Sequence, residues 1–218
     1  MTSRPAIAAA AVIGLGSLGS LGSLVGFGGL GCGKSDRNPA EGSAAAPAPV
    51  MIDVAGVNAL VPAALKDRLV FERRELPLVR GTSKGSYTLA APAGWVQTSK
   101  MFAHLRPAGA TGQSPRFEVG SNCDGPCTPQ PWEVVADRVN FAPRMRGNVI
   151  KDDHGAGRRT MIAEVTTAGV RTTDVVVAWW TDGARRYHVC TATLDDALKA
   201  AAAAFEHACQ AVASSGDD

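Results

Sequence analysis

From residue 51 onward, hydrophobic and polar residues follow one another in short runs separated by Gly, Pro, Asn and Asp, which favour turns. Runs of this length are typical of β-strands, whereas apolar residues recurring every three or four positions predict helices. The predicted strands are residues 70–78, 87–91, 101–106, 116–120, 148–152, 160–165, 172–180 and 185–191, and the predicted helices are residues 63–69, 132–141 and 195–212.

The order of these elements predicts the fold class. Strands follow one another through hairpins, and helices are inserted between groups of strands rather than alternating with single strands. We therefore expect an α+β domain with a mainly antiparallel sheet flanked by helices. The run Val175–Trp180 is apolar at odd and even positions alike, so this strand should lie inside the sheet with both faces covered. Asp182-Gly183 predicts a hairpin turn directly after it.

The C-terminal helix has the clearest helical pattern. Thr193 and Asp196 have the spacing of a capping box, which places the helix start near Asp195. The residues expected on its buried face are Leu194, Leu198, Ala202, Phe205, Cys209 and Val212.

The first fifty residues have a different composition from the rest. They hold 10 of the 24 glycines and only five charged residues, and Arg4 is the only charge before Lys34. A positive charge followed by an uncharged run and small residues is typical of an export signal. The run is also long enough for an uncleaved membrane anchor, although its many glycines disfavour a helix.

Leu30-Gly31-Cys32 resembles the lipobox of bacterial lipoproteins, although Gly29 stands where such boxes usually carry Leu. The resemblance implies that residues 1–31 are removed and that Cys32 becomes the first residue, carrying fatty acyl groups such as palmitate. Residues 32–50 are rich in Ala, Pro, Ser and Gly and predict a flexible tether. A single α+β domain over residues 51–213 and a disordered tail over residues 214–218 complete the expected organisation.

Residues 28–35 also match the phosphate-binding pattern G-x-x-x-x-G-K-[ST], with Lys34 at the lysine position. That chemistry requires a strand before the loop and a helix after it. An export signal precedes the match and Pro39 follows it, so composition explains the match better than a nucleotide site does.

The five cysteines are Cys32, Cys123, Cys127, Cys190 and Cys209. Lipidation of Cys32 leaves an even number, which suits disulfides in an exported protein. Of the three possible pairings we favour Cys123–Cys127 and Cys190–Cys209. The first closes a short loop before the helix predicted over residues 132–141, and the second joins the last predicted strand to the C-terminal helix.

Two metal or redox alternatives use the same cysteines. His188, Cys190, His207 and Cys209 contain the side chains of a zinc site, but residues two apart on a helix point in different directions, which disfavours it. Cys123 and Cys127 precede a predicted helix, where a thiolate is stabilised. This pair is the basis for an alternative function in thiol redox chemistry or copper handling, with His104, His154 or His188 as a further ligand.

Asp152, Asp153 and His154 lie close together in sequence and are a further candidate metal site. A polar hairpin loop is the simpler interpretation, because Asp, Gly and His are ordinary turn residues. We therefore expect no resident metal or other cofactor.

The segment Tyr87-Thr-Leu-Ala-Ala-Pro-Ala-Gly-Trp95 resembles the opening of PsbP-like domains, in which a strand is followed by Pro-x-Gly-Trp. The expected order of elements is similar over about residues 85–212. The resemblance implies the α+β fold of that family and a role in binding or scaffolding rather than catalysis. It assigns no functional residue.

The formal net charge of +2 excludes a strongly basic nucleic-acid-binding protein. These features together predict a cell-envelope lipoprotein, anchored in a membrane and facing the periplasm or the exterior. We expect it to act by binding or structural interaction, with an envelope protein as partner, rather than as an enzyme.

Overall fold

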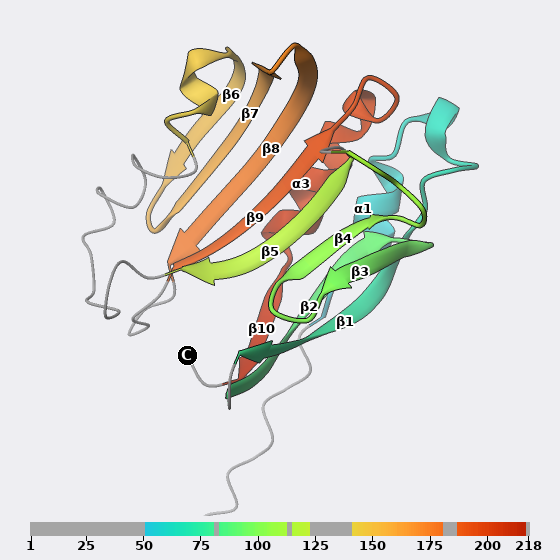
Figure 1. Cartoon of the computed structure of the whole chain (residues 1–218), viewed down its shortest axis with the longest axis vertical. Coiled ribbons are helices and arrows are strands. Elements are labelled where there is room, and N and C mark those ends of the chain that lie inside the picture. Colours follow the sequence, from blue (N-terminus) through green and yellow to red (C-terminus); the bar gives the residue numbers. More distant parts are fainter. Residues whose placement is uncertain (1–50, 81–82, 113–114, 123–140, 181–186, 217–218) are drawn as a thin grey trace, which may run out of the picture. The chain divides into compact units, whose positions relative to one another are not determined.

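The computed structural model describes residues 51–80, 83–112, 115–122, 141–180 and 187–216, which form two antiparallel β-sheets (Figure 1). The tether, the helix expected over residues 132–141, and Cys32, Cys123 and Cys127 lie outside these residues. No helix in the described ranges is long and apolar enough to cross a membrane.

The larger sheet has seven strands in the order β3-β4-β5-β9-β8-β7-β6. Its strands are β3 (Trp95–Ser99), β4 (Ala103–Pro107), β5 (Arg116–Asn122), β6 (Asn148–Gly155), β7 (Arg158–Thr167), β8 (Val170–Trp180) and β9 (Tyr187–Leu194). Val175, Val176, Val177 and Ala178 of β8 are all fully buried. The prediction that this strand is covered on both faces is confirmed, and β8 pairs antiparallel with β9 as the hairpin prediction requires.

The smaller sheet has three strands, β1 (Phe71–Arg80), β2 (Ser83–Pro92) and β10 (Ala213–Gly216), with β2 in the middle. Sequence analysis places a disordered tail over residues 214–218, whereas residues 214–216 of that segment pair with β2, from Ser214↔Tyr87 to Gly216↔Gly85. Small polar residues carry no hydrophobic pattern, so the main-chain hydrogen bonds of this edge strand are not visible in the sequence.

The N-terminal helices differ from those expected. Helix α1 covers Val54–Ala59, and the Asp53 carboxylate caps it by accepting a hydrogen bond from the Gly56 amide at 2.8 Å. The helix expected over residues 63–69 is reduced to the single 3₁₀ turn η1 (Ala63–Leu65). A second 3₁₀ turn, η2 (Arg144–Arg146), precedes β6.

The C-terminal helix is also shorter than expected. A 3₁₀ turn, η3 (Lys199–Ala201), leads into helix α3 (Ala202–Gln210). The predicted capping box is wrong, because Thr193 belongs to β9. Asp195 begins this segment instead, and its side chain accepts hydrogen bonds from the amides of Ala197 and Leu198, each at 3.1 Å.

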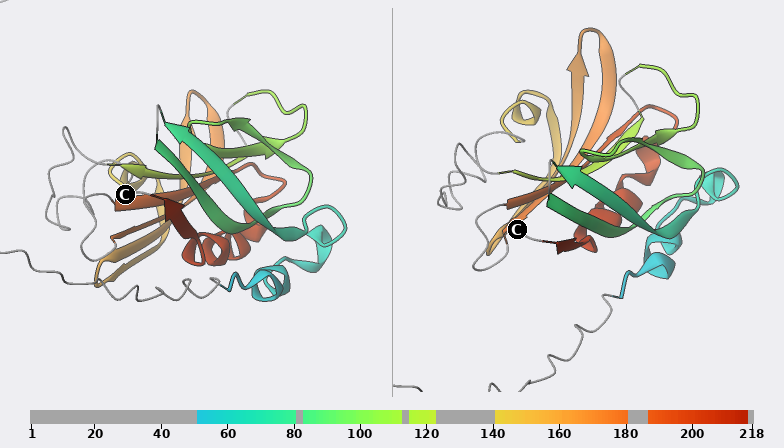
Figure 2. Two further views of the ribbon diagram at one scale, coloured as in Figure 1. Left: turned by 90° about the horizontal axis from the view of Figure 1, so that it is seen from below. Right: turned by 60° about the horizontal axis from the view of Figure 1, so that its bottom comes forward.

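The expected sheet flanked by helices is therefore wrong. Among the described residues ten strands predominate, and α3, the longest helix, has only nine residues. The β1–β2 hairpin does not join the larger sheet but forms a second sheet with β10, and β2 of this sheet contacts α3 (Figure 2). Leu76 and Leu89 of the smaller sheet share one hydrophobic cluster with Phe117 of the larger sheet.

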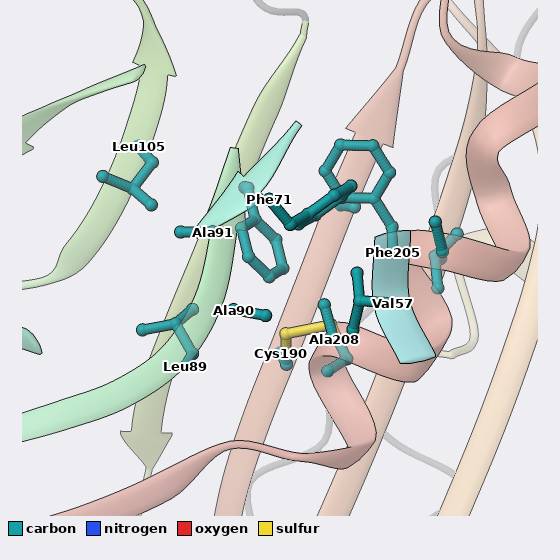
Figure 3. Close-up of a cluster of buried hydrophobic side chains, with 14 of the residues drawn as sticks. Val57, Phe71, Leu89, Ala90, Ala91, Leu105, Cys190, Phe205 and Ala208 are labelled. Atoms are coloured by element: carbon teal, nitrogen blue, oxygen red, sulfur yellow. A yellow bond between two sulfur atoms is a disulfide. The ribbon is translucent and has the colours of Figure 1, made fainter. Parts of the chain in front are cut away.

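Phe205 of α3 is fully buried in this cluster (Figure 3). Its ring centroid is 5.1 Å from that of Phe71, 5.5 Å from that of Phe117 and 6.0 Å from that of Trp95. These three partners come from β1, β5 and β3. One side chain thus connects α3 with both sheets.

The opposite face of the larger sheet has a smaller cluster around Phe141 on β7 and β8. Arg159 of β7 is almost fully buried there, with its guanidinium carbon 4.4 Å from the centroid of the Phe141 ring. The same guanidinium donates hydrogen bonds to both carboxylate oxygens of Asp152, at 2.9 and 2.8 Å. Burying an unpaired guanidinium would cost free energy, and the two hydrogen bonds to Asp152 offset that cost.

Among the described residues, Ala168 in the β7–β8 hairpin is the only residue other than glycine with a positive φ angle. Ala168 (φ 50°) and Gly169 (φ 80°) form the two-residue connection between the paired residues Thr167 and Val170. Two positive φ angles are typical of a type I′ turn, which favours Asn-Gly because a β-carbon is strained in the left-handed region.

We expect Ala168→Asn to stabilise the protein by about 1 kcal/mol, because Asn tolerates the left-handed conformation better than Ala. Urea denaturation measures the change. Ala156→Asn, in the β6–β7 hairpin, is the matched control, because Ala156 does not have a positive φ and should change stability by less than about 0.5 kcal/mol. Equal gains from both substitutions would contradict the explanation.

Candidate functional site

The sulfur atoms of Cys190 and Cys209 are joined as a disulfide, the pairing predicted from the sequence. Cys190 lies on β9 and Cys209 on α3, with their Cα atoms 5.4 Å apart. The two residues are 0% and 1% exposed. The bond attaches α3 to the larger sheet inside the main hydrophobic cluster, so its role there is structural.

The zinc alternative on the same elements is not supported. Both sulfurs are used in the disulfide, Nδ1 of His188 lies 3.1 Å from the hydroxyl of Tyr87, and Nε2 of His207 lies 3.1 Å from the Asp53 carboxylate. His188 is buried and stacks on Trp179. In the described part of the chain, no three His, Cys, Asp or Glu side chains gather as metal ligands.

The Asp152, Asp153 and His154 group is part of strand β6 and not of a loop, and the turn is confined to residues 156–157. Successive residues of a strand point to opposite faces, which separates the two aspartates. Asp152 binds Arg159 and lies 3.2 Å from Nε2 of His154, whereas Asp153 lies 3.0 Å from Nζ of Lys151. These carboxylates are thus ion-paired within the sheet.

An open cleft of about 430 Å³ lies on the larger sheet, on the face opposite α3. It crosses β4, β5 and β9, and the turn between β3 and β4 forms one wall. Strand register explains which side chains meet there: His104 is opposite Glu118, Glu118 is opposite Thr191, and Gly120 is opposite Val189. The lining residues are Phe102, His104, Glu118, Val119, Gly120, Ser121, Val189 and Thr191.

The surroundings of His104 lower its pKa below the ordinary value for histidine. Burial lowers its pKa, and this effect outweighs the opposite effect of the Glu118 carboxylate 3.9 Å away. The positive charges of Arg106 and Arg116 lower the pKa further. Nε of Arg106 donates a hydrogen bond to Nε2 of His104 at 3.2 Å, so the imidazole proton lies on Nδ1.

The wall of the cleft is apolar and exposed. Met101 and Phe102 are 58% and 53% exposed, in the turn where sequence analysis begins a strand. His104 is the only residue of this cleft that sequence analysis singles out. The alternation Phe117-Glu-Val-Gly120 indicates that Glu118 and Gly120 face away from the core, but their neighbours depend on long-range pairing that this local pattern does not contain.

Lipidation at Cys32 and the Cys123–Cys127 bridge stay predictions, because these residues lie outside the described ranges. No protein-family model matches the chain, and no curated protein matches it.

Proposed function

We propose that this chain is a lipid-anchored protein of the bacterial cell envelope whose folded part acts by binding. The observation that supports it most directly is the buried Cys190–Cys209 disulfide. Structural disulfides persist in exported proteins and are rare in reducing compartments. The proposal agrees with the export signal and with Cys32, which the lipobox resemblance assigns to lipid attachment.

The cleft supports binding as the mode of action. It combines exposed apolar surface at Phe102 with polar groups at His104 and Glu118, on a face of the sheet that strands hold in place. A concave surface with apolar walls and a few directed polar groups is typical of ligand sites.

The intact mass of the chain, expressed with its own signal in a Gram-negative host, tests the anchor. We expect a chain that starts at Cys32, carries acyl groups and sediments with membranes. Cys32→Ser should lose both acylation and membrane association, whereas the matched control Ser35→Ala should keep both. An unmodified full-length chain carrying Cys32 would overturn the proposal.

Alkylation in the same experiment tests the remaining cysteines. We expect four alkyl labels only after reduction and denaturation, because the proposal pairs Cys123 with Cys127 and Cys190 with Cys209. Labelling of Cys123 and Cys127 without reductant would instead favour the thiol redox or copper-handling alternative.

A further inference from the structure

The floor of the cleft is a glycine that the fold itself does not require. Gly120 lies inside β5, its φ is not in the left-handed region, and a β-carbon there would meet no atom of the described residues within 4 Å. Gly147 is the contrast, because a β-carbon there would collide with the carbonyl oxygen of Glu164. Glycine inside a strand weakens it and often marks a place where a ligand approaches the backbone. We therefore attribute the glycine at position 120 to the open space above it, which a side chain would fill.

Two apolar surfaces border this space. Val189 pairs with Gly120 from the neighbouring strand and is half-buried, and Phe102 forms the wall. Together with the bare backbone of Gly120 they make a shallow apolar surface on which the C–H face of a ring can rest. The open shape of the cleft allows a ligand chain to extend beyond it.

The polar groups of the cleft favour a ligand without net charge. The Glu118 carboxylate is 39% exposed and lies 3.8 Å from Nε of Arg116 and 3.9 Å from Nε2 of His104, beyond hydrogen-bond distance. Among the residues that line the cleft Glu118 alone carries a charge, which disfavours anions, and the guanidinium groups of Arg106 and Arg116 next to the cleft weaken its attraction for cations. Its oxygens are nevertheless well placed to accept hydrogen bonds from hydroxyl groups.

We propose that the cleft binds a neutral pyranose ring of an oligosaccharide, which rests its C–H face on Gly120 and Phe102 and donates hydroxyl hydrogen bonds to Glu118. The buried Thr191 hydroxyl and the imidazole of His104 line the same row of the sheet and complete the polar side. This inference deepens the binding role proposed above and rests on it.

Calorimetric titration of the full-length purified protein, in a detergent without sugar headgroups, tests the proposal. The probes are neutral tetrasaccharides of glucose, mannose and N-acetylglucosamine, together with a tetrasaccharide of glucuronic acid. We expect saturable binding of at least one neutral probe and at least tenfold weaker binding of the acidic one. Absence of binding by every neutral probe, or tighter binding of the acidic probe, overturns the proposal.

Two cleft variants locate the binding. Gly120→Val fills the floor and Phe102→Ala removes the wall, and each should weaken binding at least tenfold. The matched control Thr88→Val adds valine on β2 of the smaller sheet and should leave binding unchanged. Wild-type affinity in Gly120→Val overturns the proposal. The melting temperature of Gly120→Val should stay unchanged or rise, and a fall of several degrees would show that the space is already filled and would overturn the proposal.

The lipid anchor and the sugar site are tested independently. A chain mass without acyl groups at Cys32 would refute the anchor. A correctly lipidated protein that binds no sugar would refute only the proposed ligand class.

Discussion

Phe205→Ala is expected to reduce the free energy of unfolding by about 3–5 kcal/mol, the largest effect of any substitution considered for this protein. The Phe205 ring is 0% exposed and contacts aromatic rings from both sheets (Figure 3). Truncation removes these contacts and leaves a cavity that three surrounding strands and a helix cannot close. Urea or thermal denaturation followed by circular dichroism measures the loss.

Phe102→Ala is the matched control for that substitution. Phe102 is 53% exposed at the rim of the cleft, so its truncation should cost less than about 0.5 kcal/mol. Similar losses from the two substitutions would contradict the assignment of Phe205 to the main hydrophobic cluster.

Removal of the disulfide is expected to have the second largest effect. The double variant Cys190→Ala/Cys209→Ala should lose about 3 kcal/mol, because the bond closes a loop of about 20 residues and restricts the unfolded chain. Denaturation of the variant and the wild-type protein, each with and without reductant, measures the effect.

Reductant distinguishes this disulfide from the one predicted between Cys123 and Cys127. The Cys123→Ala/Cys127→Ala variant should keep its sensitivity to reductant, because the buried Cys190–Cys209 bond remains. If the Cys190→Ala/Cys209→Ala protein were as stable as the oxidised wild type, the role of this bond in attaching α3 to β9 would be refuted.

Most strands could be predicted from the sequence, because hydrophobic and polar residues alternate in their central parts or because these parts are continuously apolar. Val175 to Ala178 is the best example, since a run apolar at both parities requires cover on both faces, and both faces are covered. The Cys190–Cys209 pair was also predictable, because it joins a strand to the helix that follows it. Short β3 and β10 were missed, since half or more of their residues are exposed or polar and main-chain pairing defines them.

The fold class could not be predicted by counting elements. Helical periodicity over residues 195–212 is real, but Asp195 initiates a 3₁₀ turn and α-helical hydrogen bonding begins only at Ala202. Helix α1 escaped detection because its signal is a single cap at Asp53 and only six residues. Whether the β1–β2 hairpin joins the main sheet or forms another depends on packing against Phe205, which no local pattern records.

The candidate cleft was hidden for the same reason. Glu118 and Gly120 are separated by about seventy residues from Thr191 and Val189, and only strand register brings these pairs together. Sequence analysis considered His104 only as a ligand for copper near distant cysteines. Its surroundings, and the burial that lowers its pKa, come from the sheet.

The pairing of strand β10, residues 213–216, influences when the core can form during folding. This pairing with β2 joins residues 213–216 to residues 85–88, and Phe205 and Cys209 also lie near the C-terminal end. The strand pairing and the ring contacts of Phe205 join segments that lie far apart in sequence, and contacts of this kind form late because a long loop must close first. The core between the sheets therefore cannot close before residues 205–216 have been synthesised, whatever the earlier strands have already formed.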